Sequence, residues 1–243
     1  MPYIRCETIA GRTIIQEQYQ APRWNVKVPD RLPPSDVMSE AQEMANARRE
    51  CRELTIKLNA NFSPGDFHLV LDYTRDNRPE TIEDAKEDRS AFMRRLRYVY
   101  KKAGVILKYA IVTEYGKKGG LHHHIIVNRD RNIDSDEIRR IWKKGRIHLN
   151  PMEDNPNYQR LAEYILKTRK YWRKLGGHGR QWTCSRNLVR PETKKTIMKR
   201  DAYFELPKPK KGYVLDTQSV REGVTEDGYP WKSCVYIRAG NDP

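Results

Sequence analysis

The strongest constraint on the fold is the way apolar and polar residues alternate between residues 67 and 177. "FHLVLDY", at 67–73, has the two-residue period of a half-buried strand. Residues 79–104 begin with acidic residues and end with basic residues before a glycine, a charge order that favours an α-helix. Further strands are expected at 105–115, 121–128 and 146–152, and further helices at 134–145 and 155–177.

This order of elements, β-α-β-β-α-β-α, predicts the fold class α+β. Two split β-α-β units give an antiparallel four-stranded sheet with helices on one face, as in ferredoxin-like folds. Outside this region we expect strands at 3–9 and 13–19, a helix at 35–62, and short strands within 180–187, 211–216 and 232–238.

The pattern suggests three parts, although no linker marks a clean boundary between them. Residues 1–54 are expected to form an N-terminal extension, and residues 55–177 the central domain. Residues 178–243 are expected to form a C-terminal extension that packs on the same domain.

The expected hairpin at 105–128 carries three consecutive histidines. Successive side chains of a strand point to opposite faces, so His122 and His124 share one face and His123 the other. Glu114 lies on the preceding strand, and a cross-strand neighbour is ~5 Å away. The hairpin therefore predicts a metal site with two histidines, one carboxylate and open positions. The ligand set suits Mn²⁺, with Mg²⁺ and Zn²⁺ as alternatives. Ordinary half-exposed strand histidines are the competing interpretation.

The helix expected at 155–177 combines exposed tyrosine with positive charge. Tyr164 and Lys167 are three residues apart and therefore lie on the same face. A phenol with an ordinary pKa of ~10 attacks phosphorus only with help from a cation or a metal. Tyr164 is thus a candidate nucleophile, and Lys167 and the predicted metal site are the cation and the metal that could assist its attack. A solvated basic helix face is the alternative. Candidate DNA-binding residues on this helix are Arg160, Arg169, Lys170, Arg173 and Lys174.

The strand expected at 67–73 lies next to the hairpin in the predicted sheet. His68 and Asp72 share one of its faces because they are an even number of residues apart. Either side chain could therefore border the metal site.

The charge of the chain indicates which partners it binds. The 47 Lys and Arg residues outnumber the 32 Asp and Glu residues, giving a net charge of +15. Nucleic acid is the first candidate partner, and an acidic membrane surface is the second. No segment approaches the ~18 consecutive apolar residues of a spanning helix, and no signal peptide is recognisable. We expect a soluble cytoplasmic protein that does not bind membranes, with four reduced, mostly structural cysteines.

Three separated segments resemble the motifs of HUH endonucleases, with rolling-circle replication initiators of small plasmids and single-stranded DNA phages as the nearest likeness. They are "FHLVLDYT" (67–74), "GGLHHHIIV" (119–127) and "EYILK" (163–167). The resemblance covers roughly residues 55–175. It implies a ferredoxin-like sheet with the metal on its open face and the tyrosine helix beside it.

The resemblance also implies an activity and a set of partners. Glu114, His122 and His124 would hold Mn²⁺ or Mg²⁺, and Tyr164 would form a 5′-phosphotyrosine link and free a 3′-OH. Lys167 would orient or neutralise the phosphate. The expected partners are single-stranded or hairpin origin DNA, a host helicase and a host polymerase.

The sequence departs from the motif pattern in two ways and leaves two other functions open. A histidine occupies the usually apolar middle position of the second motif, and no second tyrosine lies four residues after Tyr164. No Walker-type loop is present, so a helicase would come from the host. The alternatives are a transposase or relaxase of the same superfamily, and a non-catalytic single-stranded nucleic-acid binding protein.

Overall fold

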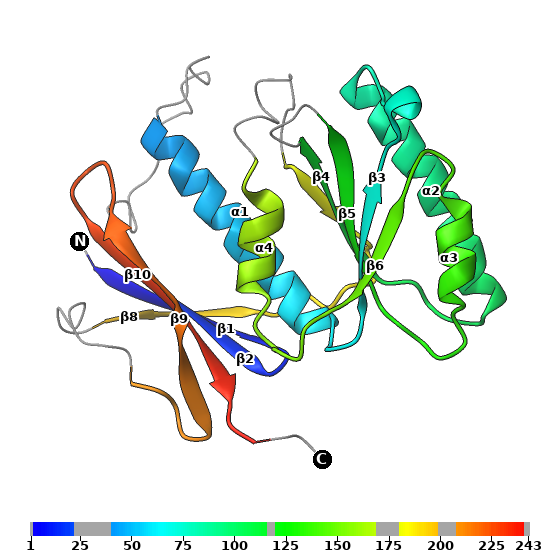
Figure 1. The fold of residues 1–243 in the computed structure, drawn as a ribbon. Helices are drawn as coiled ribbons and strands as arrows, with labels where there is room; N and C mark the ends of the chain where they lie inside the picture. The colour runs from blue at the N-terminus through cyan, green and yellow to red at the C-terminus, as the bar shows by residue number, and fades with distance from the viewer. Residues whose placement is uncertain (1, 22–39, 116–119, 169–179, 199–207, 241–243) are drawn as a thin grey trace. The chain divides into compact units, whose positions relative to one another are not determined.

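The computed structural model describes residues 2–21, 40–115, 120–168, 180–198 and 208–240. Within these ranges the chain forms two antiparallel sheets and helices, which confirms the predicted α+β class (Figure 1). The chain divides into two compact units, and each is described by itself. No helix in the described ranges has an apolar stretch long enough to cross a membrane.

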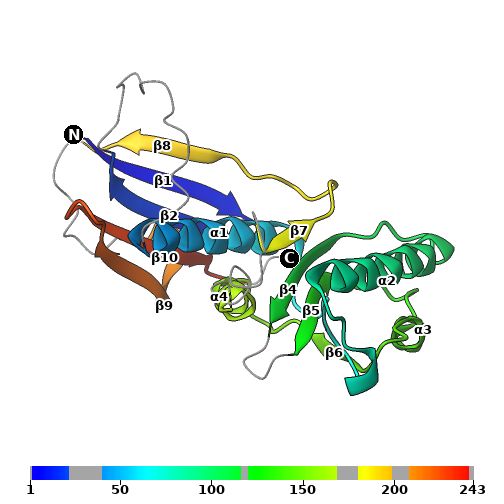
Figure 2. The same cartoon turned by 90° about the horizontal axis from the view of Figure 1, so that it is seen from above.

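The first unit comprises Met1–Ala60, Pro156–Arg160 and Arg190–Pro243. Its sheet has the strand order β8-β1-β2-β10-β9, and all neighbours are antiparallel. The strands are β1 Tyr3–Ala10, β2 Thr13–Gln20, β8 Thr193–Ile197, β9 Tyr213–Val224 and β10 Pro230–Arg238. Helix α1 (Glu40–Asn61) lies along one face, where Ile56 packs on Ile15 and Val235 (Figure 2). Residues 35–39 of the predicted helix lie outside the described residues.

The second unit comprises Asn61–Asn155 and Leu161–Val189. Its antiparallel sheet has the order β6-β3-β5-β4-β7. The strands are β3 Phe67–Asp72, β4 Tyr109–Tyr115, β5 Leu121–Val127, β6 Ile147–Pro151 and β7 Trp182–Cys184. The helices are α2 Ile82–Lys102, α3 Ser135–Ile141, α4 Gln159–Leu166 and the short 3₁₀ helix η1 Arg75–Asn77. The predicted β-α-β-β-α-β order is confirmed, and β7 adds a fifth strand beside β4.

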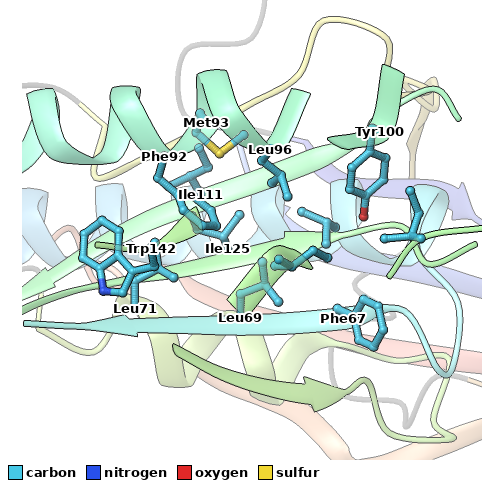
Figure 3. Packing of buried hydrophobic residues seen from close by; sticks show 13 residues of the cluster. Phe67, Leu69, Leu71, Phe92, Met93, Leu96, Tyr100, Ile111, Ile125 and Trp142 are labelled. Atoms are coloured by element: carbon cyan, nitrogen blue, oxygen red, sulfur yellow. The ribbon is translucent and has the colours of Figure 1, made fainter. Parts of the chain in front are cut away.

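Helices α2 and α3 cover one face of this sheet and build its core with it. Phe92 and Leu96 of α2 face Leu69 and Leu71 of β3, and all four side chains are buried (Figure 3). Trp142, just after α3, closes one end of the same core. Because neighbouring strand residues point to opposite faces, the even-numbered residues of β3, β4 and β5 lie on the other face. That face carries the predicted metal ligands.

Local signals in the sequence set the limits of α2. Thr81 and Asp84 form a reciprocal capping box that satisfies backbone donors at the start of the helix. Gly104 follows the helix with a positive φ of 71°, a conformation that glycine adopts without a steric penalty. The predicted helix at 79–104 therefore becomes Ile82–Lys102.

Other predicted elements are also shorter than expected. The helix predicted at 134–145 ends at Ile141, because the chain then lies against β3. A side chain at Gly145 would meet the Asp72 carbonyl oxygen at 2.1 Å, so this close approach requires glycine. The strand predicted at 105–115 begins only at Tyr109. The helix predicted at 155–177 spans only Gln159–Leu166 and is followed by a turn at 167–168, and residues 169–177 lie outside the described residues.

Candidate metal centre and tyrosine site

The hairpin of β4 and β5 brings the three predicted metal ligands together. Glu114 lies directly across the ladder from His122, and His124 is two residues further along the same face. His124 Nε2 lies 2.8 Å from Glu114 Oε2, and His122 Nε2 lies 3.3 Å from the same oxygen. One ligand atom from each residue falls within 4.8 Å of the others. The three side chains therefore form a group that can hold a metal ion.

His123 belongs to the opposite face, as strand alternation predicts. Its side chain is fully buried and lies near the Tyr73 hydroxyl (2.9 Å) and the Thr113 hydroxyl (3.0 Å). Arg89 donates a hydrogen bond to Thr113 and completes this network. Burial lowers the pKa of His123 to about 3, and the positive charge of Arg89 acts in the same direction. His123 is thus a neutral, hydrogen-bonded core residue.

The charge of Glu114 is the main electrostatic feature of the site. Its side chain is only 2% exposed. Burial raises the pKa of Glu114, but hydrogen bonds from His122 and His124 outweigh burial and lower it to about 2. Burial also lowers the pKa of His124, and the hydrogen bond to Glu114 opposes this effect only partly. An ionised carboxylate beside imidazoles is the protonation state from which a cation is bound.

His68 of β3 contacts the metal group directly. It faces Ile126 of β5 directly and reaches His124 along the diagonal. His68 Nε2 lies 2.9 Å from His124 Nδ1, and the two rings stack with centroids 5.1 Å apart. Burial, followed by the charge of His124, lowers the pKa of His68 to about 4. A neutral His68 can either donate or accept a hydrogen bond at Nε2. It can therefore form a hydrogen bond with His124 Nδ1 whether or not that nitrogen carries a proton.

Asp72, the other residue left open by the sequence, makes a different contact. Its carboxylate Oδ2 lies 3.3 Å from His148 Nε2 of β6, and both side chains are about half exposed. Asp72 is also the cross-strand neighbour of His122 on β5. The Asp72–His148 pair thus extends the polar surface of the metal face toward β6.

Helix α4 and the turn that follows it place Tyr164 and Lys167 at the edge of the metal group. Ala162 and Ile165 are buried, whereas Tyr164 is 51% exposed. The Tyr164 ring lies edge-on to His124, with centroids 5.8 Å apart. Lys167 Nζ lies 3.6 Å from the centre of the Tyr164 ring and 3.7 Å from Glu114 Oε1. The ammonium group therefore touches both the phenol ring and the buried carboxylate.

Of the predicted DNA-binding residues, the structure describes Arg160 alone. It is exposed on the first turn of α4 and donates a hydrogen bond to the Gln218 side chain. The other four predicted contacts lie outside the described residues: Arg169, Lys170, Arg173 and Lys174.

The donor set fits a divalent first-row cation. Two imidazole nitrogens and one ionised carboxylate oxygen converge from the two strands of a hairpin. Imidazole suits zinc and other late transition metals, whereas carboxylate suits magnesium and manganese. Three protein ligands leave coordination positions open for a substrate oxygen. The exposed ring of Tyr164 lies beside His124, one of these ligands.

The fold and the site together define an α+β domain with a buried Glu-His-His group beside an exposed tyrosine. Residues 66–169 of the chain match the model of the family described as "Replication-associated protein ORF2/G2P". The matched segment contains Glu114, both histidine ligands, Tyr164 and Lys167. Over this segment the chain is similar to replication-associated proteins of that family. No curated protein matches the chain.

Proposed function

We propose that the protein is a metal-dependent endonuclease of the HUH type. It would nick single-stranded DNA and transfer the strand through a 5′-phosphotyrosine intermediate. This reaction would start rolling-circle replication of a plasmid or phage. The observation that carries the proposal is the contact of Tyr164 with His124, because it places an exposed phenol against the buried metal-binding group. The family match over residues 66–169 agrees with a role in replication.

Each side chain of the site has a role in this reaction. Glu114, His122 and His124 would hold Mn²⁺ or Mg²⁺, which supplies positive charge to polarise the scissile phosphate. The Tyr164 hydroxyl would lose its proton to solvent and form a bond to phosphorus. The bond from phosphorus to the 3′-oxygen would break, and that oxygen would take up a proton to give a free 3′-OH.

Lys167 would act on the same phosphate as Tyr164. Its ammonium group lies close to the phenol ring, where it can neutralise charge on the phosphate oxygens. In the second step a 3′-OH would attack the phosphotyrosine, join the strands and release the Tyr164 phenol. A single tyrosine can complete both steps in turn. DNA, a host helicase and a host polymerase are the partners this function requires.

The test uses labelled single-stranded oligonucleotides that tile the replicon carrying the gene. The proposal predicts cleavage at one site and a covalent protein–DNA band that requires Mn²⁺ or Mg²⁺. The band should disappear in Tyr164→Phe and persist in Tyr158→Phe, a substitution at a buried tyrosine near the start of the same helix. Cleavage only at transposon ends or at a conjugative transfer origin would favour a transposase or relaxase. Chelator-insensitive binding without cleavage would favour a non-catalytic single-strand binding protein.

A further inference from the structure

A shallow groove of about 580 Å³ lies in the second unit, on the side of the sheet away from the metal ligands. It is formed by the last turns of α2, the loop that leads into β4, and the residues that follow β7. Tyr109, which lines the groove, is five residues before Glu114 on β4. An odd spacing puts the two side chains on opposite faces, and they are ~17 Å apart along the strand. The groove is therefore separate from the proposed active site.

The floor of the groove is apolar. Val105 and Leu107 are partly buried, and each also packs against the core between α2 and the sheet. Tyr100 also lines the groove, and its hydroxyl donates a hydrogen bond to the Asn128 carbonyl oxygen. Ile106 is 75% exposed. Ile106 also lines the groove, so its side chain extends the apolar surface of the floor.

The rim of the groove is positively charged. Arg97 and Lys101 extend from α2, and Arg186 extends from the segment after β7. No acidic residue lines the groove, and none of these three cations forms an ion pair with an acidic side chain among the described residues. The charge of the rim is thus available to a negatively charged partner.

The interior of the groove offers little to a β-strand or to a nucleobase. Backbone groups along its wall are already bonded within the unit: the Tyr109 amide to Ser185, and the Leu107 carbonyl to Asn187. The ring of Tyr109 is covered by the guanidinium of Arg97, which also donates to the phenol oxygen. Tyr100 is fully buried. Added strands need free backbone groups and bases need free aromatic faces, so neither is favoured here.

We propose that this groove binds an acidic peptide segment of a partner protein, one whose apolar side chains fill the floor while its carboxylates meet the rim. An apolar floor makes no favourable contact with a phosphate backbone. A peptide with acidic and apolar side chains can contact both the positively charged rim and the apolar floor. The volume is that of an ordinary binding cleft and accommodates a few side chains.

The experiment measures binding of fluorescein-labelled decapeptides to the full-length chain by fluorescence anisotropy. One set combines Asp or Glu with Leu, Ile or Phe at varied positions. A matched set replaces every acidic residue by its amide. We expect acidic members to bind about tenfold more tightly than their amide counterparts, and to weaken as salt is raised.

Charge and surface variants assign the binding to the groove. Lys101→Glu combined with Arg186→Glu should weaken peptide binding about tenfold or more, and Ile106→Ser should also weaken it. Arg94→Glu makes the same charge change at an exposed position of α2 outside the groove, and should leave binding unchanged. All substituted side chains are exposed, so the variants should fold, and thermal unfolding is the measurement that checks this.

Three results would overturn the proposal. In the first, no acidic peptide binds more tightly than its amide counterpart. In the second, the groove variants bind peptides as the unsubstituted chain does. In the third, the groove variants lose affinity for oligonucleotides while peptides remain unbound, which would assign the groove to nucleic acid. Binding by Tyr164→Phe should equal that of the unsubstituted chain, so the outcome is independent of the proposed nicking activity.

Discussion

Replacing His68 by phenylalanine should weaken metal binding without touching a metal ligand. When a cation occupies Nε2 of His124, the proton of that ring sits on Nδ1, which lies 2.9 Å from His68 Nε2. His124 is 2% exposed, so water cannot replace the lost acceptor. A buried donor without a partner costs about 1–3 kcal/mol, and about 1.4 kcal/mol corresponds to tenfold in affinity. We therefore expect His68→Phe to bind Mn²⁺ about 10- to 100-fold more weakly.

The assay is calorimetric titration of the full-length chain with Mn²⁺, checked by electron paramagnetic resonance of the free ion. His68→Gln keeps an amide that can donate or accept, and should recover most of the affinity. His148→Phe is the matched control. It also removes a histidine from this face of the sheet, but His148 pairs with Asp72 and not with a predicted metal ligand. The reasoning is refuted if His68→Phe binds Mn²⁺ as tightly as the unsubstituted chain, or if His148→Phe weakens binding equally.

Three further predictions concern pH, catalysis and the core. The pKa of His123 is lowered to about 3 in the folded chain, so between pH 6.5 and 3 the unfolded chain binds the additional proton. The free energy of unfolding in EDTA should therefore fall by a few kcal/mol as the pH drops through this window. Urea titrations should show a smaller fall for His123→Gln. An equal fall in both chains would contradict the lowered pKa of His123. Lys167→Met should change the free energy of unfolding by less than about 1 kcal/mol, because the ion pair of Lys167 with Glu114 is partly exposed. The same substitution should slow nicking by about 100-fold or more. Single-turnover rates on the origin oligonucleotide test this, and an unchanged rate would remove Lys167 from the mechanism. Leu96→Ala should lower the free energy of unfolding by about 2–5 kcal/mol, because the Leu96 side chain is fully buried between α2 and the sheet. Lys101→Ala on the same helix should lower it little. Similar losses for both variants would argue against this core.

The order of elements and the two faces of the hairpin could be predicted because both depend on local periodicity. Alternation alone separates His122 and His124 from His123, and the structure has the same separation. Strand alternation could not decide whether His68 or Asp72 contacts the metal group, because it shows which face of the sheet a residue lies on but not which residues of the next strand lie beside it. The pairing of β3 with β5 puts both residues next to a ligand, with Asp72 opposite His122 and His68 diagonal to His124; the side-chain contacts separate them, because His68 reaches His124 and Asp72 pairs with His148.

Other features depend on contacts that the sequence does not display. Strand β8 (Thr193–Ile197) was not predicted, because its residues are mostly exposed and have no apolar alternation. The early end of α3 follows from the close approach of Gly145 to β3, a contact between segments about 70 residues apart. The exposure of Tyr164 could be expected from helical spacing, but its contact with His124 is a feature of the fold.

The most direct test of the proposed function is mass spectrometry of the covalent adduct. The full-length chain is incubated with the cleaved oligonucleotide and Mn²⁺, digested, and the modified peptide is sequenced. The account predicts a nucleotide attached to Tyr164, and no adduct when EDTA is present or in Tyr164→Phe. An adduct on another residue, or one that forms equally well in EDTA, would contradict it.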